Sequence, residues 1–131
     1  MAEAFANAEI HKRGLSLSAE SAGLAAFPGS PASPNAIAAV KEAGGDLSNF
    51  RSQPLTKKTV RSTEAIYCMT QSHLLQARAL FPEDSEKFRL LGKEDVRDPY
   101  GGDIEMYRNT MKQIIPAVKE ILNRFEERNP Q

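Results

Sequence analysis

The chain has 131 residues, the length of one domain with a core of its own. Its 17 basic residues balance 17 acidic ones, so no basic surface for nucleic acid is indicated. No apolar run reaches the ~20 residues that cross a membrane, and no secretory leader is visible. The single cysteine, Cys68, cannot form an internal disulfide, which fits a reducing cytoplasm. We therefore expect one soluble cytoplasmic domain that binds neither nucleic acid nor membranes.

Hydrophobic periodicity and turn residues predict helices and short strands in succession. In chain order, the expected elements are a helix over 2–13, a weak strand over 15–20, a loop over 27–32, a helix from Ser33 to Gly44, a polar helical turn over 57–61, a strand over 65–69, a helix from Thr70 and a short strand over 88–91. Because strand and helix alternate, the pattern favours an α/β fold with a parallel sheet.

The longest predicted helix covers residues 103–127. Apolar residues recur at helical spacing from Ile104 to Phe125, and Asp103 occupies the position of an N-cap. Pro116 interrupts this pattern and is expected to bend the helix locally, because it removes one backbone donor.

The six residues that precede this helix form the most informative loop. Residues 98–103 read Asp-Pro-Tyr-Gly-Gly-Asp, so one torsion is fixed and two glycines permit positive φ. A carboxylate at the start of a rigid turn, held by an anchored helix, can be presented to a ligand. Such a segment taken alone is more often a plain turn, so both interpretations stay open at this point.

Five segments together resemble the low-molecular-weight protein tyrosine phosphatase family. They are Met1-Ala2-Glu3-Ala4-Phe5, Ser21-Ala22-Gly23, Arg51-Ser52-Gln53-Pro54-Leu55-Thr56, Cys68-Met69-Thr70 and Asp98-Pro99-Tyr100-Gly101-Gly102. Each segment is weak evidence alone, but the five occur in the family's order and spacing along the whole chain. The bacterial branch, which includes protein-arginine phosphatases, looks most similar.

The resemblance implies a single three-layer α/β/α domain over residues 1–131, with a parallel sheet of strand order 2-1-3-4. In that family a Cys-x5-Arg loop cradles the phosphate at a helix N-terminus, and the Cys thiolate attacks phosphorus. Asp98 matches the general acid and base, and Tyr100 matches the aromatic residue at the substrate entrance. The implied substrate is a phosphoprotein carrying phosphotyrosine or phosphoarginine, and no cofactor is implied.

The chain departs from the family at its start. The family reads from the phosphate loop through Arg-Ser-Pro into Met-Ala-Glu-Ala, and this chain begins at that Met. We therefore expect an N-terminally truncated domain without the first strand, the nucleophilic Cys and the phosphate-binding Arg. Cys68 does not replace them, because Leu74 stands where the Arg would be needed. His11 and His73 have no ligand spacing, so no metal site is expected.

The expected loss is structural as well as chemical. If the missing strand buried about five large apolar side chains, roughly 8–15 kcal/mol of burial is gone, and a domain is stable by only about 5–15 kcal/mol. The chain should then be marginal, rearrange, or self-associate through its exposed sheet edge.

Three readings remain. The complete protein is a phosphatase whose reading frame starts upstream, or the chain is a non-catalytic binding module, or it is a fragment without function. In each of them the 131-residue chain itself is expected to be inactive.

Overall fold

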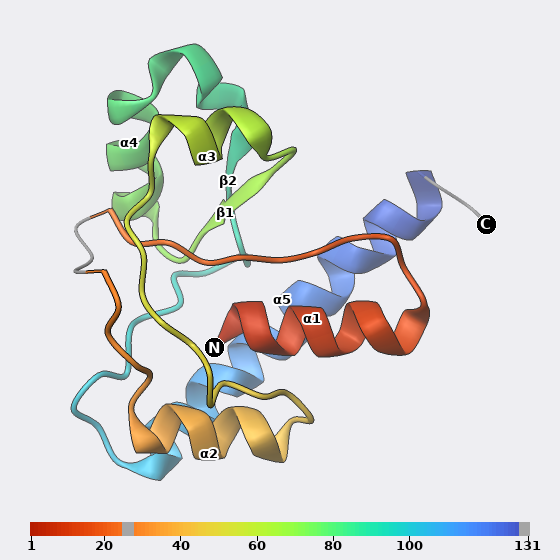
Figure 1. The fold of residues 1–131 in the computed structure, drawn as a ribbon, viewed down its shortest axis with the longest axis vertical. Helices are drawn as coiled ribbons and strands as arrows, with labels where there is room; N and C mark the ends of the chain where they lie inside the picture. The colour runs from red at the N-terminus through yellow and green to blue at the C-terminus, as the bar shows by residue number, and fades with distance from the viewer. Residues whose placement is uncertain (25–27, 129–131) are drawn as a thin grey trace.

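The computed structural model describes residues 1–24 and 28–128 (Figure 1). Residue 27 of the expected loop at 27–32 lies outside them. The elements are α1 (Ala2–Arg13), α2 (Pro34–Glu42), α3 (Lys57–Ser62), β1 (Ile66–Cys68), α4 (Gln71–Leu80), the 3-10 helix η1 (Pro82–Lys87), β2 (Phe88–Leu90) and α5 (Ile104–Arg128).

The sheet in the described chain consists of β1 and β2, which run parallel. Tyr67 lies opposite Arg89 in the register. The chain crosses over between the strands through α4 and η1, as a parallel pair requires. Beyond the strands, Val96 N donates to Met69 O at 2.8 Å, so the pairing leads directly into the segment before Asp98. The predicted strands at 65–69 and 88–91 and the α/β class with a parallel sheet are confirmed.

The strand predicted over residues 15–20 is wrong. Side chains along this segment alternate between half-buried and exposed, as in a strand, but no neighbouring backbone among the described residues forms a ladder with it. At Ala19 the side chain of Asn7 bonds to the backbone as a neighbouring strand would. Its Nδ2 donates to the Ala19 carbonyl and its Oδ1 accepts from the Ala19 amide, both at 2.9 Å. Three helices therefore precede β1, and strict alternation of strand and helix does not hold.

Helices cover the strands from two sides, and each side has its own apolar core. Figure 1 shows α1 and α2 lying against α5, whereas α3 and α4 gather around β1 and β2. The larger core joins α1, α2 and α5; the buried side chains of α5 that take part are Tyr107, Met111, Ile114, Val118, Ile121 and Leu122. The smaller core contains Val60, Cys68, Leu74, Ala77 and Phe88. The predicted apolar stripe of α5 is therefore the central packing surface of the larger core.

The predicted helix caps are confirmed. Ser33 Oγ accepts from Ala36 N at 3.3 Å, Thr70 Oγ1 from His73 N at 3.1 Å, and Asp103 Oδ1 from Met106 N at 3.0 Å. Each bond satisfies one backbone donor that the first turn of a helix leaves unpaired. Pro116 lies inside α5, and the bend expected there stays a prediction.

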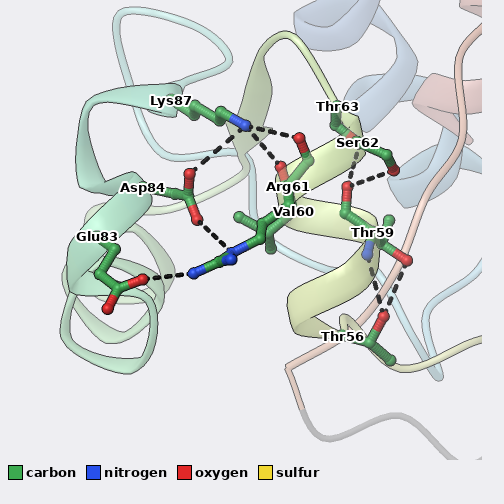
Figure 2. A network of polar contacts seen from close by, with 9 residues as sticks. All are labelled: Thr56, Thr59, Val60, Arg61, Ser62, Thr63, Glu83, Asp84 and Lys87. Carbon is green, nitrogen blue, oxygen red and sulfur yellow. Dashed lines mark hydrogen bonds and ion pairs between the residues drawn. The ribbon is translucent and has the colours of Figure 1, made fainter.

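The short helix α3 is tied to η1 at its C-terminal end (Figure 2). Lys87 Nζ donates to Val60 O at 3.0 Å and to Arg61 O at 3.1 Å. An ammonium group there donates to carbonyls of the last helical turn and complements the negative end of the helix dipole. Arg61 also forms an ion pair with Glu83 at 2.5 Å, so α3 and η1 are held from both directions.

Candidate functional site

Residues 98–102 form a hydrogen-bonded turn. Asp98 Oδ1 accepts from Tyr100 N at 3.0 Å, and Gly102 N donates to Pro99 O at 2.8 Å. Gly101 has φ of 81°, a left-handed conformation that glycine adopts without a steric penalty. The turn therefore fixes the direction of the Asp98 carboxylate and leaves Tyr100 pointing outward, with 84% of its surface exposed.

Gly102 is needed for space rather than for its backbone angles. A Cβ atom there would lie 2.6 Å from Met106 Sδ and 2.9 Å from Pro99 O. The second contact is with the backbone of the turn itself, so a side chain would push the turn away from α5. The two glycines of the loop thus serve different purposes.

The start of α2 lies against this loop. Asn35 Nδ2 donates to Gly102 O at 3.2 Å, and Ser33 Oγ donates to Tyr107 Oη at 3.1 Å. Between them and Tyr100 opens a pocket of about 340 Å³ with no charged residue in its lining. Reasoning from the sequence missed Asn35, because an Asn in the first turn of a helix gives no sign of a partner 67 residues away.

Asp98 is also close to the start of α1. Burial lowers the pKa of the Met1 α-amino group, and the negative charges of Glu3 and Asp98 oppose that shift. The carboxylate is therefore within electrostatic reach of the N-terminal end of α1, where the helix dipole favours an anion.

Three of the five segments that carry the family resemblance meet in one hydrogen-bond network. Glu3 Oε1 accepts from Ser21 N at 2.6 Å and from Ser21 Oγ at 2.9 Å. Gln53 Nε2 donates to Ser21 O at 2.9 Å, and Gly23 N donates to Gln53 O at 2.9 Å. The segment after α1 and the connector before α3 are therefore both fixed to the first turn of α1.

Cys68 lies in the smaller core and not on a phosphate-binding loop. Its side chain packs with Leu74 and Phe88, and 9% of the residue is exposed. Burial raises the pKa of the thiol, and the positive charge of Arg78 opposes the shift. A thiol with a raised pKa is protonated at neutral pH and is a poor nucleophile.

Residues 1–24 and 28–128 contain no group of three or more His, Cys, Asp or Glu side chains placed to hold a metal ion. None of the helices in this part of the chain is long and apolar enough to span a bilayer.

Comparison with protein families matches residues 1–131 to the family described as low molecular weight phosphotyrosine protein phosphatase. The chain belongs to this phosphatase family. Among its relatives, a protein-arginine-phosphatase of Bacillus subtilis is 29% identical over 133 residues, which is 97% of this chain and 88% of the relative.

Solved structures of the phosphatase family share the fold. The crystal structure of a YwlE mutant from Bacillus subtilis has a TM-score of 0.89 and 27% identity, and the match covers 95% of this chain and 88% of that one. A low molecular weight protein tyrosine phosphatase from T. tengcongensis has a TM-score of 0.89 and 29% identity, covering 94% of this chain and 88% of that one. The relatives are thus named for phosphoarginine and for phosphotyrosine chemistry.

Proposed function

We propose that this chain carries the acid–base half of a low-molecular-weight protein phosphatase, with Asp98 as the general acid and base. The observation that supports the proposal most is the placement of Asp98. Its carboxylate is held by a turn and lies within electrostatic reach of the start of α1. Tyr100, exposed on the same turn, is proposed to contact the phosphorylated residue of the substrate protein.

The proposed reaction has two steps. A cysteine thiolate attacks phosphorus and the bond to the leaving group breaks, while Asp98 gives its proton to the leaving oxygen, or to the leaving nitrogen of phosphoarginine. Asp98, now a carboxylate, then takes a proton from the water that attacks the phosphocysteine. Free phosphate and the thiolate are released, and Asp98 is protonated again.

The nucleophile is the part that these 131 residues do not supply. Their single cysteine is Cys68, and Leu74 stands six residues later in place of an arginine. We propose that the chain as given is inactive. We propose that a Cys-x5-Arg loop and strand of the family type, outside these residues, would supply the nucleophile and the sheet order 2-1-3-4.

The test joins this chain to a strand and a Cys-x5-Arg loop of the type that the family resemblance implies. We expect the joined protein to hydrolyse para-nitrophenyl phosphate and to form a phosphocysteine in rapid-quench experiments. Asp98→Asn should lower kcat by roughly 10²–10⁴-fold, the usual contribution of a general acid. Asp46→Asn is the matched control, because the hydrogen bonds of Asp46 among the described residues lie within its own exposed turn at Ser48. A joined enzyme whose kcat is unaffected by Asp98→Asn contradicts the proposal.

The substrate class is proposed as phosphotyrosine or phosphoarginine in proteins, because relatives of both kinds match this chain. Parallel assays of the joined protein on a phosphotyrosine peptide and a phosphoarginine peptide distinguish the two. A cytoplasmic location is part of the same proposal, since the one cysteine is a buried free thiol.

A binding role without catalysis is the alternative, and the short sheet favours it. Among the described residues β1 pairs only with β2, so the sheet ends at these two strands. We propose that a second copy of the chain pairs with this exposed sheet edge. Sedimentation velocity over a range of concentrations tests this, and a monomer at every concentration contradicts it. A fragment without function would show neither turnover nor assembly.

A further inference from the structure

A continuous path of hydrogen bonds leads from α2 to the carboxylate of Asp98. Asn35 Nδ2 donates to Gly102 O at 3.2 Å. Gly102 N donates to Pro99 O at 2.8 Å, which closes the turn, and Tyr100 N donates to Asp98 Oδ1 at 3.0 Å. Each bond constrains the residue that makes the next one.

From this path we infer that Asn35 is a positioning residue for Asp98. The inference rests on the proposed function of Asp98, but the bonds that carry it are independent of any reaction. Asn35 lines the pocket beside Tyr100, but the hydrogen bond of its side chain goes to Gly102 O and not to the Asp98 carboxylate. It acts by holding the far end of the turn, and the turn then orients the carboxylate.

Helix α2, which carries Asn35, is anchored at several points that do not involve Asn35. Ala36 and Val40 of α2 are buried in the larger core, at 7% and 0% exposure. At the other end of α2, Glu42 accepts three hydrogen bonds from Arg108 of α5, at 2.9, 3.3 and 2.7 Å. Because α2 is fixed to α5 without Asn35, loss of the Asn35 amide should loosen the loop and leave the helix in place.

The orientation has a chemical consequence. The bond from Tyr100 N occupies Asp98 Oδ1, and Oδ2 has no partner among the described residues. Oδ2 is thus the oxygen available to exchange a proton with a substrate. If the turn opens, both oxygens become equivalent and the carboxylate rotates freely, so fewer molecules hold it in a productive direction.

NMR on the 131-residue chain tests the inference without any need for turnover. In Asn35→Ala we expect the amide protons of Tyr100 and Gly102 to exchange with solvent about fivefold faster, the change expected for one ordinary hydrogen bond. The Tyr100 amide signal should move toward its position in Asp98→Ala, which removes the acceptor. Asn35→Gln keeps a donor and should move these signals less than Asn35→Asp, which keeps the shape alone.

Asn7→Ala is the matched control. Asn7 also donates from its side-chain amide to a backbone carbonyl, but at Ala19, away from the loop. It should change the signals near Ala19 and leave Tyr100 and Gly102 unaffected. The amides of Leu91 and Val96, bonded to β1 and the residue after it, report global unfolding and should exchange at unchanged rates.

Unchanged amide exchange at Tyr100 and Gly102 in Asn35→Ala overturns the inference. The inference is also overturned if exchange at Leu91 and Val96 accelerates as much as at Tyr100 and Gly102 in both Asn35→Ala and Asn35→Asp, because the whole fold is then destabilised. A loosened loop in a joined protein that shows no turnover instead contradicts only the proposed function. In an active joined protein, Asn35→Ala should lower kcat with little change in KM.

Discussion

Arg108 of α5 binds Glu42 of α2 through two nitrogens, with Nε 2.9 Å from Oε1 and Nη2 2.7 Å from Oε2. Arg108 also contacts Glu105 one turn earlier on α5. This pair joins the last turn of α2 to the first turns of α5, at the end of α2 away from Asn35. Hydrogen bonds from Arg108, and then its charge, lower the pKa of Glu42.

The bond between Arg108 and Glu42 predicts a dependence of stability on pH. A carboxyl whose pKa is lowered on folding stabilises the fold above its unfolded pKa, about 4.5 here, and loses that contribution as pH falls through the folded value. Glu42→Gln should therefore unfold at a lower urea concentration than the parent at pH 7. The difference should shrink as the pH falls below about 4.5, because the unfolded chain then binds a proton at Glu42 before the folded chain does, and it should be lost below the lowered pKa of the folded chain. Both residues are well exposed, so the effect is small.

Urea titrations at pH 7 and pH 3.5 in the Arg108→Ala background provide the control for this prediction. There the same Glu42→Gln change should have almost no effect. If the difference in urea midpoint between Glu42→Gln and its parent grows toward low pH, Arg108 does not stabilise the charged form of Glu42 as described.

Among residues of the smaller core, we expect truncation of Phe88 in β2 to cause the largest loss of stability. It is fully buried, and its ring stacks on Phe81 with centroids 6.0 Å apart. Phe88→Ala should destabilise the fold by about 3–5 kcal/mol, measured by urea unfolding. Leu75→Ala is the control, because Leu75 is 58% exposed on α4, and it should change stability by no more than about 0.5 kcal/mol. Equal effects of the two changes would show that β2 is not packed as described.

Cys68 should react slowly with thiol reagents. Burial raises the pKa of its thiol, so little thiolate is present at neutral pH. We expect the native chain to resist 5,5′-dithiobis(2-nitrobenzoic acid) and the urea-unfolded chain to react at once. Cys68→Ser in the protein joined to a Cys-x5-Arg loop should leave turnover within about twofold of the parent. Rapid stoichiometric labelling of the native thiol would contradict this account.

Local signals in the sequence predicted most elements well. The spacing of apolar residues placed α5 to within one residue at each end, and Ser33, Thr70 and Asp103 were recognised as caps. These features depend on neighbours within one turn of helix, so the sequence alone contains the information.

Features that depend on distant partners were not predictable in the same way. Residues 15–20 have the alternation of a strand, but a strand also needs a partner, and among the described residues the side chain of Asn7 bonds to Ala19 instead. The 3-10 helix over 82–87 was missed, because its polar residues show no helical periodicity. Asn35 was missed since its contact with Gly102 exists only once α2 packs on α5.

The most direct test of the central claim is the hydrolysis of para-nitrophenyl phosphate by the purified 131-residue chain, beside its Asp98→Asn variant. Without a nucleophilic cysteine no phosphocysteine can form, and Asp98 then has no intermediate to act on. Both proteins should therefore release nitrophenol at the rate seen in buffer alone. Turnover by the parent chain that Asp98→Asn abolishes would contradict the account, because a nucleophile would then lie within these residues.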